Sequence, residues 1–477
     1  MGRYCSTDGM LVPARTSAQS VPAPQGPRTP AEGGRCDTRP YPETSGSLVR
    51  VSDPREVSSR TCDVLVVGGG PSGASCAYWL ARAGHDVVLV ERKSYPREKT
   101  CGDGLTPRSV RQLEDMGLAD DLATSGHRYS GLRSHGFGRT LELAWPSHPE
   151  LPGYGYVITR KDLDAMVADR ATKAGATVWD GTEAVGALFE RGILRGAHVH
   201  SKTGEPGTAD AEIRARYTVV ADGANSRFGR SLGTSRNRTF PLGMAIRGYW
   251  TSPRHDEPWI DSWLDIRDKA GNVLPGYGWI FPVGDGRINV GVGLLSTFNQ
   301  WKAVNTTHLL ASFAEYAPAS WDIRPETACG PPTGGRLPMG LSVGPRSGPT
   351  WLITGDAGGT INPFNGEGIA YAYESGRYAA EAVGAALDSG DGMALRGYEQ
   401  RLHEEFDLYY RVARAFVHVI GHPQIMKTLV STGMHSRSLM EWVLRIMSNI
   451  LRPDEVGPAE AAYKALSKLA RLVPDAA

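Results

Sequence analysis

The chain has 477 residues and a mass of 51.4 kDa, enough to bury a large core divided between two lobes with appendages. Its 52 Lys and Arg balance 51 Asp and Glu, so a formal net charge of +1 gives no general attraction to nucleic acid. The six cysteines include no Cys-x-x-Cys pair, which argues against zinc and iron–sulfur centres. No segment is long and apolar enough to cross a bilayer. We therefore expect a cytoplasmic protein, free or on the inner face of the membrane, with neither a metal nor a nucleic-acid partner.

The first 58 residues are rich in Pro, Gly, Ser, Thr and Arg and have almost no apolar periodicity. Such a composition buries too little apolar surface to offset the entropy of ordering the chain. We expect residues 1–58 to be a disordered extension, and the sequence leaves open whether it has a function.

The folded part is predicted to begin with a strand, a glycine turn, a helix and a second strand. The apolar run at 63–67 is typical of a strand buried on both faces of a parallel sheet. In the turn, Gly68 permits the tight bend, Gly70 leaves room for a pyrophosphate, and Gly73 permits close helix packing. Glu91 ends the second strand where an acid accepts hydrogen bonds from ribose hydroxyls. A lone glycine motif is weak evidence, but this context favours a dinucleotide site over an ordinary turn.

A less common loop follows, in which Cys101-Gly102-Asp103-Gly104-Leu105 places an acid between two glycines after a cysteine. A backbone of this kind can lie against a flat ligand. The run resembles the mark beside the flavin in geranylgeranyl reductase-type flavoproteins, within the group that shares the fold of p-hydroxybenzoate hydroxylase. The resemblance implies non-covalently bound FAD.

Two further segments are predicted to return to the nucleotide lobe. A helix is expected from Arg160 to about Ala174, and its Arg-x-x-Leu-Asp start is similar to one in related flavoproteins. By that resemblance Arg160 reaches the isoalloxazine or the ribityl chain; ordinary surface charge at a helix N-terminus is the alternative. After several short strands, the run from Asp222 to Arg230 resembles the second signature of the group, near the pyrophosphate.

Residues 239–335 have a different pattern, with runs that alternate as antiparallel strands do. The strand around Leu274–Pro282 places Tyr277, Trp279 and Phe281 on one face. This Tyr-x-Trp-x-Phe-Pro run is another feature of the geranylgeranyl reductases. The aromatic face fits either simple core or the wall of an isoprenoid tunnel, and we favour the tunnel. We expect Gly278 to border the same space.

The chain then returns to the nucleotide lobe through a buried strand that ends at Gly355-Asp356. This ending resembles the third signature, in which the aspartate holds the ribityl hydroxyls. The Asn362–Ile369 run opens a helix whose N-terminus would face the pyrimidine edge of the flavin. The full set of expected cofactor-binding residues is Gly68, Gly70, Gly73, Glu91, Arg92, Cys101, Gly102, Asp103, Gly104, Arg108, Arg160, Asp222, Gly355, Asp356, Gly366, Glu367, Gly368 and Ile369.

The remainder is predicted to be helical, with strongly apolar stretches at 413–420 and 439–451. Helices of this kind either pack on the core or lie in a membrane interface, and the sequence leaves both open.

The predicted fold class is α/β: a Rossmann-like FAD-binding domain with an inserted antiparallel-sheet substrate domain and a C-terminal helical region. The expected boundaries are 59–135, 155–236 and 336–395 for the FAD-binding domain, 136–154 and 237–335 for the substrate domain, and 396–477 for the helices.

Within the family, the Gly-Asp-Gly-Leu-Thr-Pro-Arg, Tyr-Gly-Trp-Ile-Phe-Pro and Asn-Pro-Phe-Asn-Gly-Glu-Gly-Ile runs look most similar to the menaquinone reductases, which saturate one double bond of the isoprenoid side chain. The resemblance implies a prenyl lipid as substrate and an unidentified electron donor. We expect Cys101, Tyr277 and Trp279 to be the catalytic residues, and the sequence does not choose the proton donor. The alternatives are a geranylgeranyl-lipid or geranylgeranyl diphosphate reductase, and an FAD-dependent aromatic or quinone monooxygenase.

Overall fold

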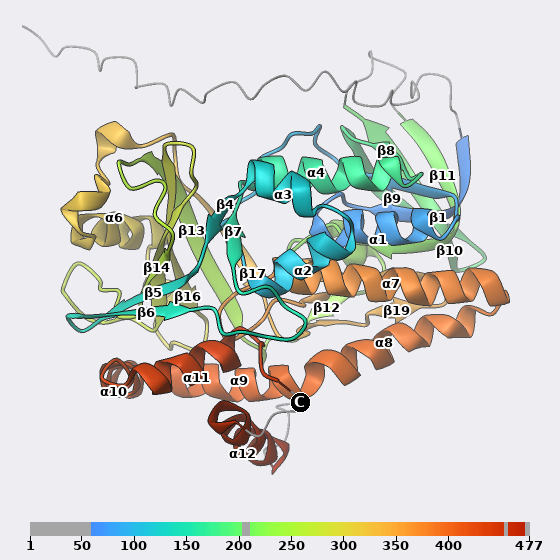
Figure 1. Cartoon of the computed structure of the whole chain (residues 1–477). Helices are drawn as coiled ribbons and strands as arrows, with labels where there is room; N and C mark the ends of the chain where they lie inside the picture. The colour runs from blue at the N-terminus through green and yellow to red at the C-terminus, as the bar shows by residue number, and fades with distance from the viewer. Residues whose placement is uncertain (1–58, 203–209, 453–456, 473–477) are drawn as a thin grey trace, which may run out of the picture. The chain divides into compact units, whose positions relative to one another are not determined.

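The computed structural model of the protein describes residues 59–202, 210–452 and 457–472, so the expectation for residues 1–58 lies outside the described part of the chain. Two large sheets, helices around them and a group of C-terminal helices make up the described residues (Figure 1). This arrangement confirms the predicted fold class.

The first sheet contains the predicted nucleotide-binding strands. Its order is β19-β20-β11-β1-β2-β8, with the antiparallel strands β10 and β9 joined to β11. β1 lies at the centre and pairs in parallel with both β2 and β11. The strands are β1 (Ser59–Val67), β2 (Val87–Val90), β8 (Thr177–Trp179), β9 (Thr182–Glu190), β10 (Ile193–Ser201), β11 (Asp210–Val220), β19 (Ser347–Gly348) and β20 (Trp351–Ile353).

Both faces of β1 are buried, which explains its continuous apolar run. Val64 and Val66 belong to the core formed with helices α1 (Pro71–Arg82) and α7 (Ile369–Ser389). Leu65 and Val67 face the opposite core, towards β10 and β20. Because side chains alternate along a strand, a sheet with two covered faces requires apolar residues at every position.

The second sheet is mostly antiparallel, with the order β17-β13-β16-β15-β14-β5-β6. One face packs on α6 (Thr306–Tyr316), through residues such as Ile280, Val292 and Phe313. Its strands are β5 (Gly131–Gly136), β6 (Arg139–Ala144), β13 (Leu242–Thr251), β14 (Ile260–Trp263), β15 (Gly276–Pro282), β16 (Arg287–Leu295) and β17 (Thr333–Pro338). β5 pairs with β14, so this sheet takes up the chain from residue 131, whereas the sequence places the start of that segment at 136. Local alternation does not reveal which sheet a strand joins.

Further elements lie around and between the two sheets. They are the strands β3 (Gly104–Leu105), β4 (His127–Tyr129), β7 (Gly155–Val157), β12 (Ser235–Arg236) and β18 (Val343–Gly344), and the helices α2 (Pro107–Asp115), α3 (Ala119–Ser125), α4 (Arg160–Lys173) and α5 (Arg227–Ser231). α4 agrees with the helix predicted from Arg160 to about Ala174.

The C-terminal helices are α8 (Arg396–Leu402), α9 (Leu408–Ile420), α10 (Pro423–Gly433), α11 (Arg437–Met447) and α12 (Pro458–Leu472). They lie along the lower edge of the view in Figure 1, with α9–α11 beneath the second sheet and α8 beneath α7. Their inner residues join the cores of both lobes; Val412 and Ala413 are examples in one, Met440 and Leu444 in the other. Among the described residues, no helix combines the length and the apolar character that crossing a bilayer requires.

Candidate cofactor and substrate site

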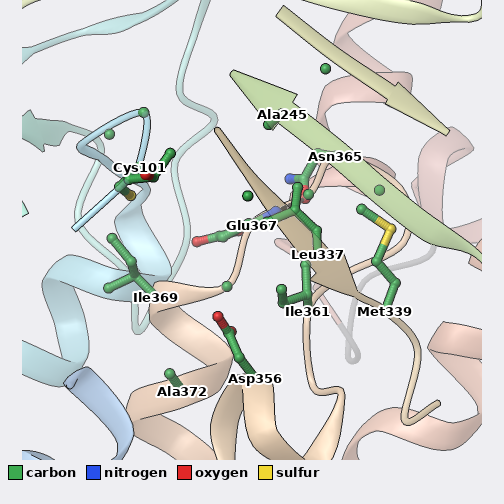
Figure 2. Close-up of a pocket in the computed structure, with 18 of the residues that line it drawn as sticks. Cys101, Ala245, Leu337, Met339, Asp356, Ile361, Asn365, Glu367, Ile369 and Ala372 are labelled. Carbon is green, nitrogen blue, oxygen red and sulfur yellow. Dashed lines mark hydrogen bonds between the residues drawn. The ribbon is translucent and has the colours of Figure 1, made fainter. Parts of the chain in front are cut away.

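A cavity of about 1050 Å³ lies between the carboxyl ends of the parallel strands and the free face of the second sheet. Carboxyl ends of parallel strands are where ligands bind in open α/β sheets. Figure 2 shows part of the lining, with Cys101 and Ile369 on one side, Leu337 and Met339 on the other, and Glu367 between them. The predicted site residues that line the cavity are Gly68, Gly70, Glu91, Arg92, Cys101, Gly102, Asp103, Gly104, Arg160, Asp222, Tyr277, Trp279, Asp356, Gly366, Glu367, Gly368 and Ile369.

The three glycines of the turn have different surroundings. Gly68 has φ +103°, and a Cβ there would lie 2.5 Å from the carbonyl oxygen of Ala221. A Cβ on Gly73 would lie 1.9 Å from the carbonyl oxygen of Gly68, so these two glycines are required by the protein's own packing. Gly70 differs, because the nearest atoms to a Cβ there are guanidinium nitrogens of Arg97 and Arg160 at 3.9 and 4.0 Å. Because Gly70 has no side chain, its backbone is open to the cavity, as a pyrophosphate site requires.

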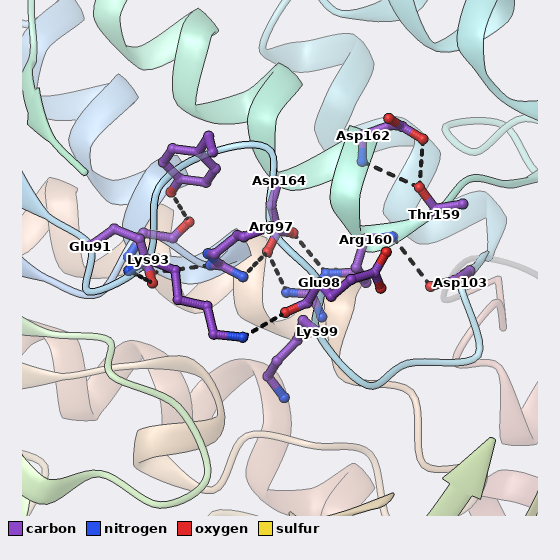
Figure 3. Close-up of polar contacts among 12 residues, drawn as sticks. Glu91, Lys93, Arg97, Glu98, Lys99, Asp103, Thr159, Arg160, Asp162 and Asp164 are labelled. Carbon is purple, nitrogen blue, oxygen red and sulfur yellow. Dashed lines mark hydrogen bonds and ion pairs between the residues drawn. The ribbon is translucent and has the colours of Figure 1, made fainter. Parts of the chain in front are cut away.

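Glu91 belongs to a buried ionic network beside this turn (Figure 3). Its Oε2 accepts from the N–H of Gly69 at 3.0 Å and pairs with Arg97 at 3.2 Å. Arg97 also pairs with Asp164 at 2.9 Å. Glu91 is thus fixed at the cavity wall, where an acid can accept from cofactor ribose hydroxyls.

The same network changes the expected role of Arg160. Its Nε and Nη2 donate to the two carboxylate oxygens of Asp164, at 2.7 and 2.8 Å. A bidentate pair of this kind holds the guanidinium in place. Arg160 lines the cavity near Gly70, so its reach towards the isoalloxazine or ribityl chain stays a prediction. Its side chain is buried, which rules out the alternative of ordinary surface charge.

Two aspartates complete the nucleotide end of the cavity. Asp222 accepts from the N–H of Phe228 at 2.9 Å through Oδ2, while its Oδ1 is buried with no hydrogen-bond partner among the described residues. Burial raises the pKa of this carboxyl. An unpartnered buried acceptor is costly and fits a hydroxyl donor on a bound cofactor. Asp356 lies beside the loop of Gly368, whose Cβ would be 3.4 Å from Oδ1.

The cysteine loop lies directly on the aromatic strand. A Cβ on Gly104 would be 3.0 Å from the ring of Phe281, and one on Gly102 would be 3.3 Å from it and 3.4 Å from the indole nitrogen of Trp279. The loop turns through Asp103, which has φ +65° and is fully buried. The two motifs, far apart in the chain, therefore meet at one place, and both glycines are needed for the contact.

Buried polar side chains of the second sheet hold this loop. Asn289, on β16, donates to the carbonyl oxygen of Cys101 at 2.9 Å and to Asp103 at 2.8 Å. Its amide oxygen accepts from Trp279 Nε1 at 2.9 Å. Arg247 donates to the same Cys101 carbonyl at 3.1 Å, and Tyr249 donates to Asp103. The sequence did not identify Asn289, Arg247 and Tyr249 as site residues. The one feature that could have pointed to them is a polar side chain within an otherwise apolar strand.

Cys101, Tyr277 and Glu367, which also line the cavity, have raised pKa values. Burial raises the pKa of the Cys101 thiol, that of Tyr277 to about 12 and that of Glu367 to about 7. Tyr277 donates to the carbonyl oxygen of Asn365 at 2.8 Å, so its proton is already engaged. Glu367 Oε1 accepts from the hydroxyls of Thr106 and Ser109, the latter at 3.2 Å. Glu367 Oε2 is buried with no hydrogen-bond partner in the described part of the chain, which favours the neutral carboxyl.

Some expected residues lie elsewhere. Arg108 pairs with Glu374 at 2.7 Å and donates to the carbonyl oxygen of Asn449 at 3.3 Å, so it ties the helices together and does not line the cavity. Gly355 packs against Ser72, where a Cβ would lie 2.7 Å from that residue's Cβ. Like Gly73, it supports the site from behind.

Gly278 also faces away from the cavity, contrary to expectation. A Cβ there would lie 2.6 Å from the ring of Phe313, in the core beneath α6. The alternation of β15 places Tyr277, Trp279 and Phe281 towards the cavity, so the glycine between them must face the other way. A glycine that does open towards the cavity is Gly293 on the neighbouring strand β16, whose Cβ would meet nothing closer than 3.8 Å.

The far end of the cavity is apolar and is formed by the C-terminal helices. It continues from Leu337, Met339 and Ile361 to side chains of α9, α10 and α11. The lining residues from these helices are Phe416, Ile420, Met426, Leu429, Val430, Gly433, Leu439, Met440, Val443, Leu444 and Met447. The sequence predicts the apolar character of these segments but not that they enclose part of the site.

Comparison with known proteins agrees with this geometry. The FAD binding domain family matches residues 61–288. The menaquinone reductase of Mycobacterium tuberculosis is 38% identical over 413 residues, which are 87% of this chain and 97% of that protein. A digeranylgeranylglycerophospholipid reductase of Thermoplasma acidophilum is 29% identical, covering 73% of this chain and 84% of that protein. A solved structure described as geranylgeranyl bacteriochlorophyll reductase-like, from the same organism, is 25% identical with a TM-score of 0.69 and covers 86% of this chain and all of the other.

These findings confirm the prediction that the cofactor is FAD. The residues present fit it: the bare face of Gly70, the fixed carboxylate of Glu91 and the unpartnered oxygen of Asp222 lie along one cavity.

Proposed function

This chain belongs to the geranylgeranyl reductase family of FAD-dependent oxidoreductases, and from that premise we propose that it saturates a double bond in the prenyl side chain of a membrane lipid, most specifically a menaquinone. The observation that carries the proposal is the meeting of the Cys101 loop and the aromatic strand in one cavity that continues into an apolar chamber. A nucleotide cofactor fits the end of the cavity at the first sheet, and a long hydrocarbon tail fits the apolar end formed by α9, α10 and α11.

The reaction requires the site to hold both a proton and a dry alkene. An isolated trisubstituted alkene is not activated for hydride attack, so protonation must lead or accompany it. When bound and reduced, FAD supplies the hydride equivalent, and an external two-electron donor regenerates the reduced cofactor. Trp279 and Phe281 pack against Gly102 and Gly104 of the cysteine loop, and these aromatic rings help to keep the bound alkene dry.

We assign the proton to this chain's own groups at that place. The Cys101 thiol is protonated at neutral pH because burial raises its pKa. Glu367 carries its proton on Oε2 because Oε1 already accepts from Thr106 and Ser109. With a pKa raised to about 7, this carboxyl can release the proton and regain it at physiological pH. Tyr277 is the poorer donor, since its hydroxyl proton is bound to the carbonyl of Asn365.

The two ends of the cavity also suggest how the domains divide the work of binding. We propose that the first sheet, with the loops at its carboxyl edge, binds FAD, and that the second sheet and α9–α11 bind the substrate. A lipid-borne tail requires access from a membrane, so we further propose that the protein acts as a peripheral protein on the inner face of the cell membrane.

The test is the mass of the product. Purified protein, chemically reduced under anaerobic conditions, is incubated with menaquinone, with a geranylgeranyl lipid and with geranylgeranyl diphosphate. We expect a gain of two hydrogens on the menaquinone side chain. Faster turnover of either geranylgeranyl compound would make the protein a geranylgeranyl-lipid or geranylgeranyl diphosphate reductase of the same family. A gain of one oxygen, with O₂ consumed under aerobic conditions, would replace the reductase by a monooxygenase.

A further inference from the structure

Helix α10 is apolar on two faces. Its inner face places Met426, Val430 and Gly433 at the cavity. Its outer face carries Ile425 and Leu429, which are one turn apart and 42% and 49% exposed. A helix between a protein and water normally has one apolar face, so the outer apolar face of α10 requires a partner.

The exposed apolar residues continue onto the neighbouring helices. Val419, near the end of α9, is 46% exposed, and Leu439, at the start of α11, is 38% exposed. Leu429 and Leu439 line the cavity as well as being exposed, so the apolar chamber opens to the surface between them. We call Val419, Ile425, Leu429 and Leu439 the portal face.

The segment that carries most of the portal face has few acids. The sequence contains no Asp or Glu between Asp407 and Glu441, whereas Lys427 and Arg437 lie in the same stretch and are exposed. Arg437 pairs with Glu441 at 3.0 Å on the exposed side of α11. Arg437 is thus partly neutralised, whereas no ion pair with an acid is found for Lys427 on α10 among the described residues. Exposed apolar side chains beside such a lysine fit an anionic lipid surface. The balanced charge of the whole chain hides this local asymmetry.

We propose that the portal face docks on an anionic lipid bilayer, placing the mouth of the apolar chamber against the acyl region. This inference rests on the proposed function for the identity of the tail, but the docking itself needs no turnover. The surface centres on α10, which lies between the two apolar stretches that the sequence singled out, 413–420 and 439–451.

Helix α12 provides a matched comparison. Leu466 and Leu469 are 44% and 61% exposed, similar to the portal residues, and Lys464 and Lys468 lie beside them. The cavity lining includes no residue of the described part of α12. If any exposed apolar and basic helix served for binding, α12 would serve equally well.

The experiment measures co-sedimentation of the full chain, with FAD bound, with vesicles of phosphatidylcholine alone or of phosphatidylcholine and phosphatidylglycerol. We expect binding to the anionic vesicles and much weaker binding to the neutral ones. Lys427→Glu reverses one charge and should weaken binding about twenty-fivefold, at roughly fivefold per unit charge. Val419→Ser with Ile425→Ser should weaken it roughly twentyfold through lost apolar burial.

Leu466→Ser with Leu469→Ser is the control and should leave vesicle binding unchanged. If the α12 variant lost vesicle binding and the variants at Lys427, Val419 and Ile425 kept it, the proposal would be overturned. Equal binding of all variants would overturn it too. If the parent protein is a dimer and the Val419→Ser, Ile425→Ser variant is a monomer, the portal face instead binds a second copy of the chain. The vesicles contain no prenyl substrate, so this outcome is independent of whether the reductase assignment is correct. The Val419 and Ile425 variants should also keep full turnover of a short prenyl analogue in detergent.

Discussion

Gly293 offers a way to fill the substrate cavity without disturbing the fold, through the change Gly293→Leu. The residue lies on β16, and a Cβ there would approach Met244, Trp279 and Tyr277 no closer than 3.8 Å. Leucine also suits a strand better than glycine, which loses more backbone entropy on folding. We therefore expect normal folding, normal FAD content and an unchanged or slightly raised Tm.

The expected effect is selectivity for chain length. The new side chain adds four carbons, close to the size of one isoprene unit, in the space beside Tyr277 and Trp279. At about 0.8 kcal/mol per buried CH₂, displacing that much tail costs about 3 kcal/mol, or roughly 100-fold in kcat/KM. A short prenyl analogue that does not reach this space should lose little.

The assay compares kcat/KM for a long-tailed menaquinone and the short analogue in the same detergent. Gly278→Leu is the matched control, because its side chain would press on Phe313 in the opposite core. Overpacking of this kind costs about 1–3 kcal/mol of stability, so that variant should melt a few degrees lower without chain-length selectivity. Equal losses for both substrates in Gly293→Leu, or selectivity in Gly278→Leu, would refute the placement of the tail.

Three further predictions concern the cofactor and the proton. Gly70→Val should fold, since a Cβ there meets nothing within 3.8 Å, but should purify with little flavin absorbance; full flavin content would remove Gly70 from the pyrophosphate site. Cys101→Ala should keep FAD and lose most turnover, whereas unchanged turnover would leave the thiol without a catalytic role. The pKa of Glu367 is raised to about 7, so turnover that uses its proton should fall as pH rises through 7, and Glu367→Gln should lose that inflection. The raised pKa of Glu367 also means that the folded protein loses stability as pH rises from about 4.5, the ordinary pKa of a glutamate, to about 7. The Tm of Glu367→Gln should therefore exceed that of the parent at pH 8 and equal it near pH 4. A lower Tm of the variant at pH 8 would show that the fold stabilises the carboxylate.

The sequence by itself determined the local parts of the cofactor site. Gly68, Gly70 and Gly73 follow a strand at fixed spacing, and Glu91 closes the next strand, so their geometry depends on neighbours along the chain. A short strand–turn–helix unit folds in one way, which is why its residues could be assigned in advance. The same holds for the aromatic face of β15, since alternation alone places Tyr277 and Trp279 together.

The tertiary structure alone decided which faces meet. Alternation defines two faces of a strand but not which one borders a cavity, so the expectation for Gly278 failed because α6 covers its side of the sheet. Asn289 became visible as the residue that joins Cys101 to Trp279 only when segments almost 190 residues apart were brought into contact. The salt bridge between Arg108 and Glu374, and the portal between α10 and α11, have the same origin. Each depends on contacts between distant segments, and a pattern along the chain carries no record of its partners across the fold.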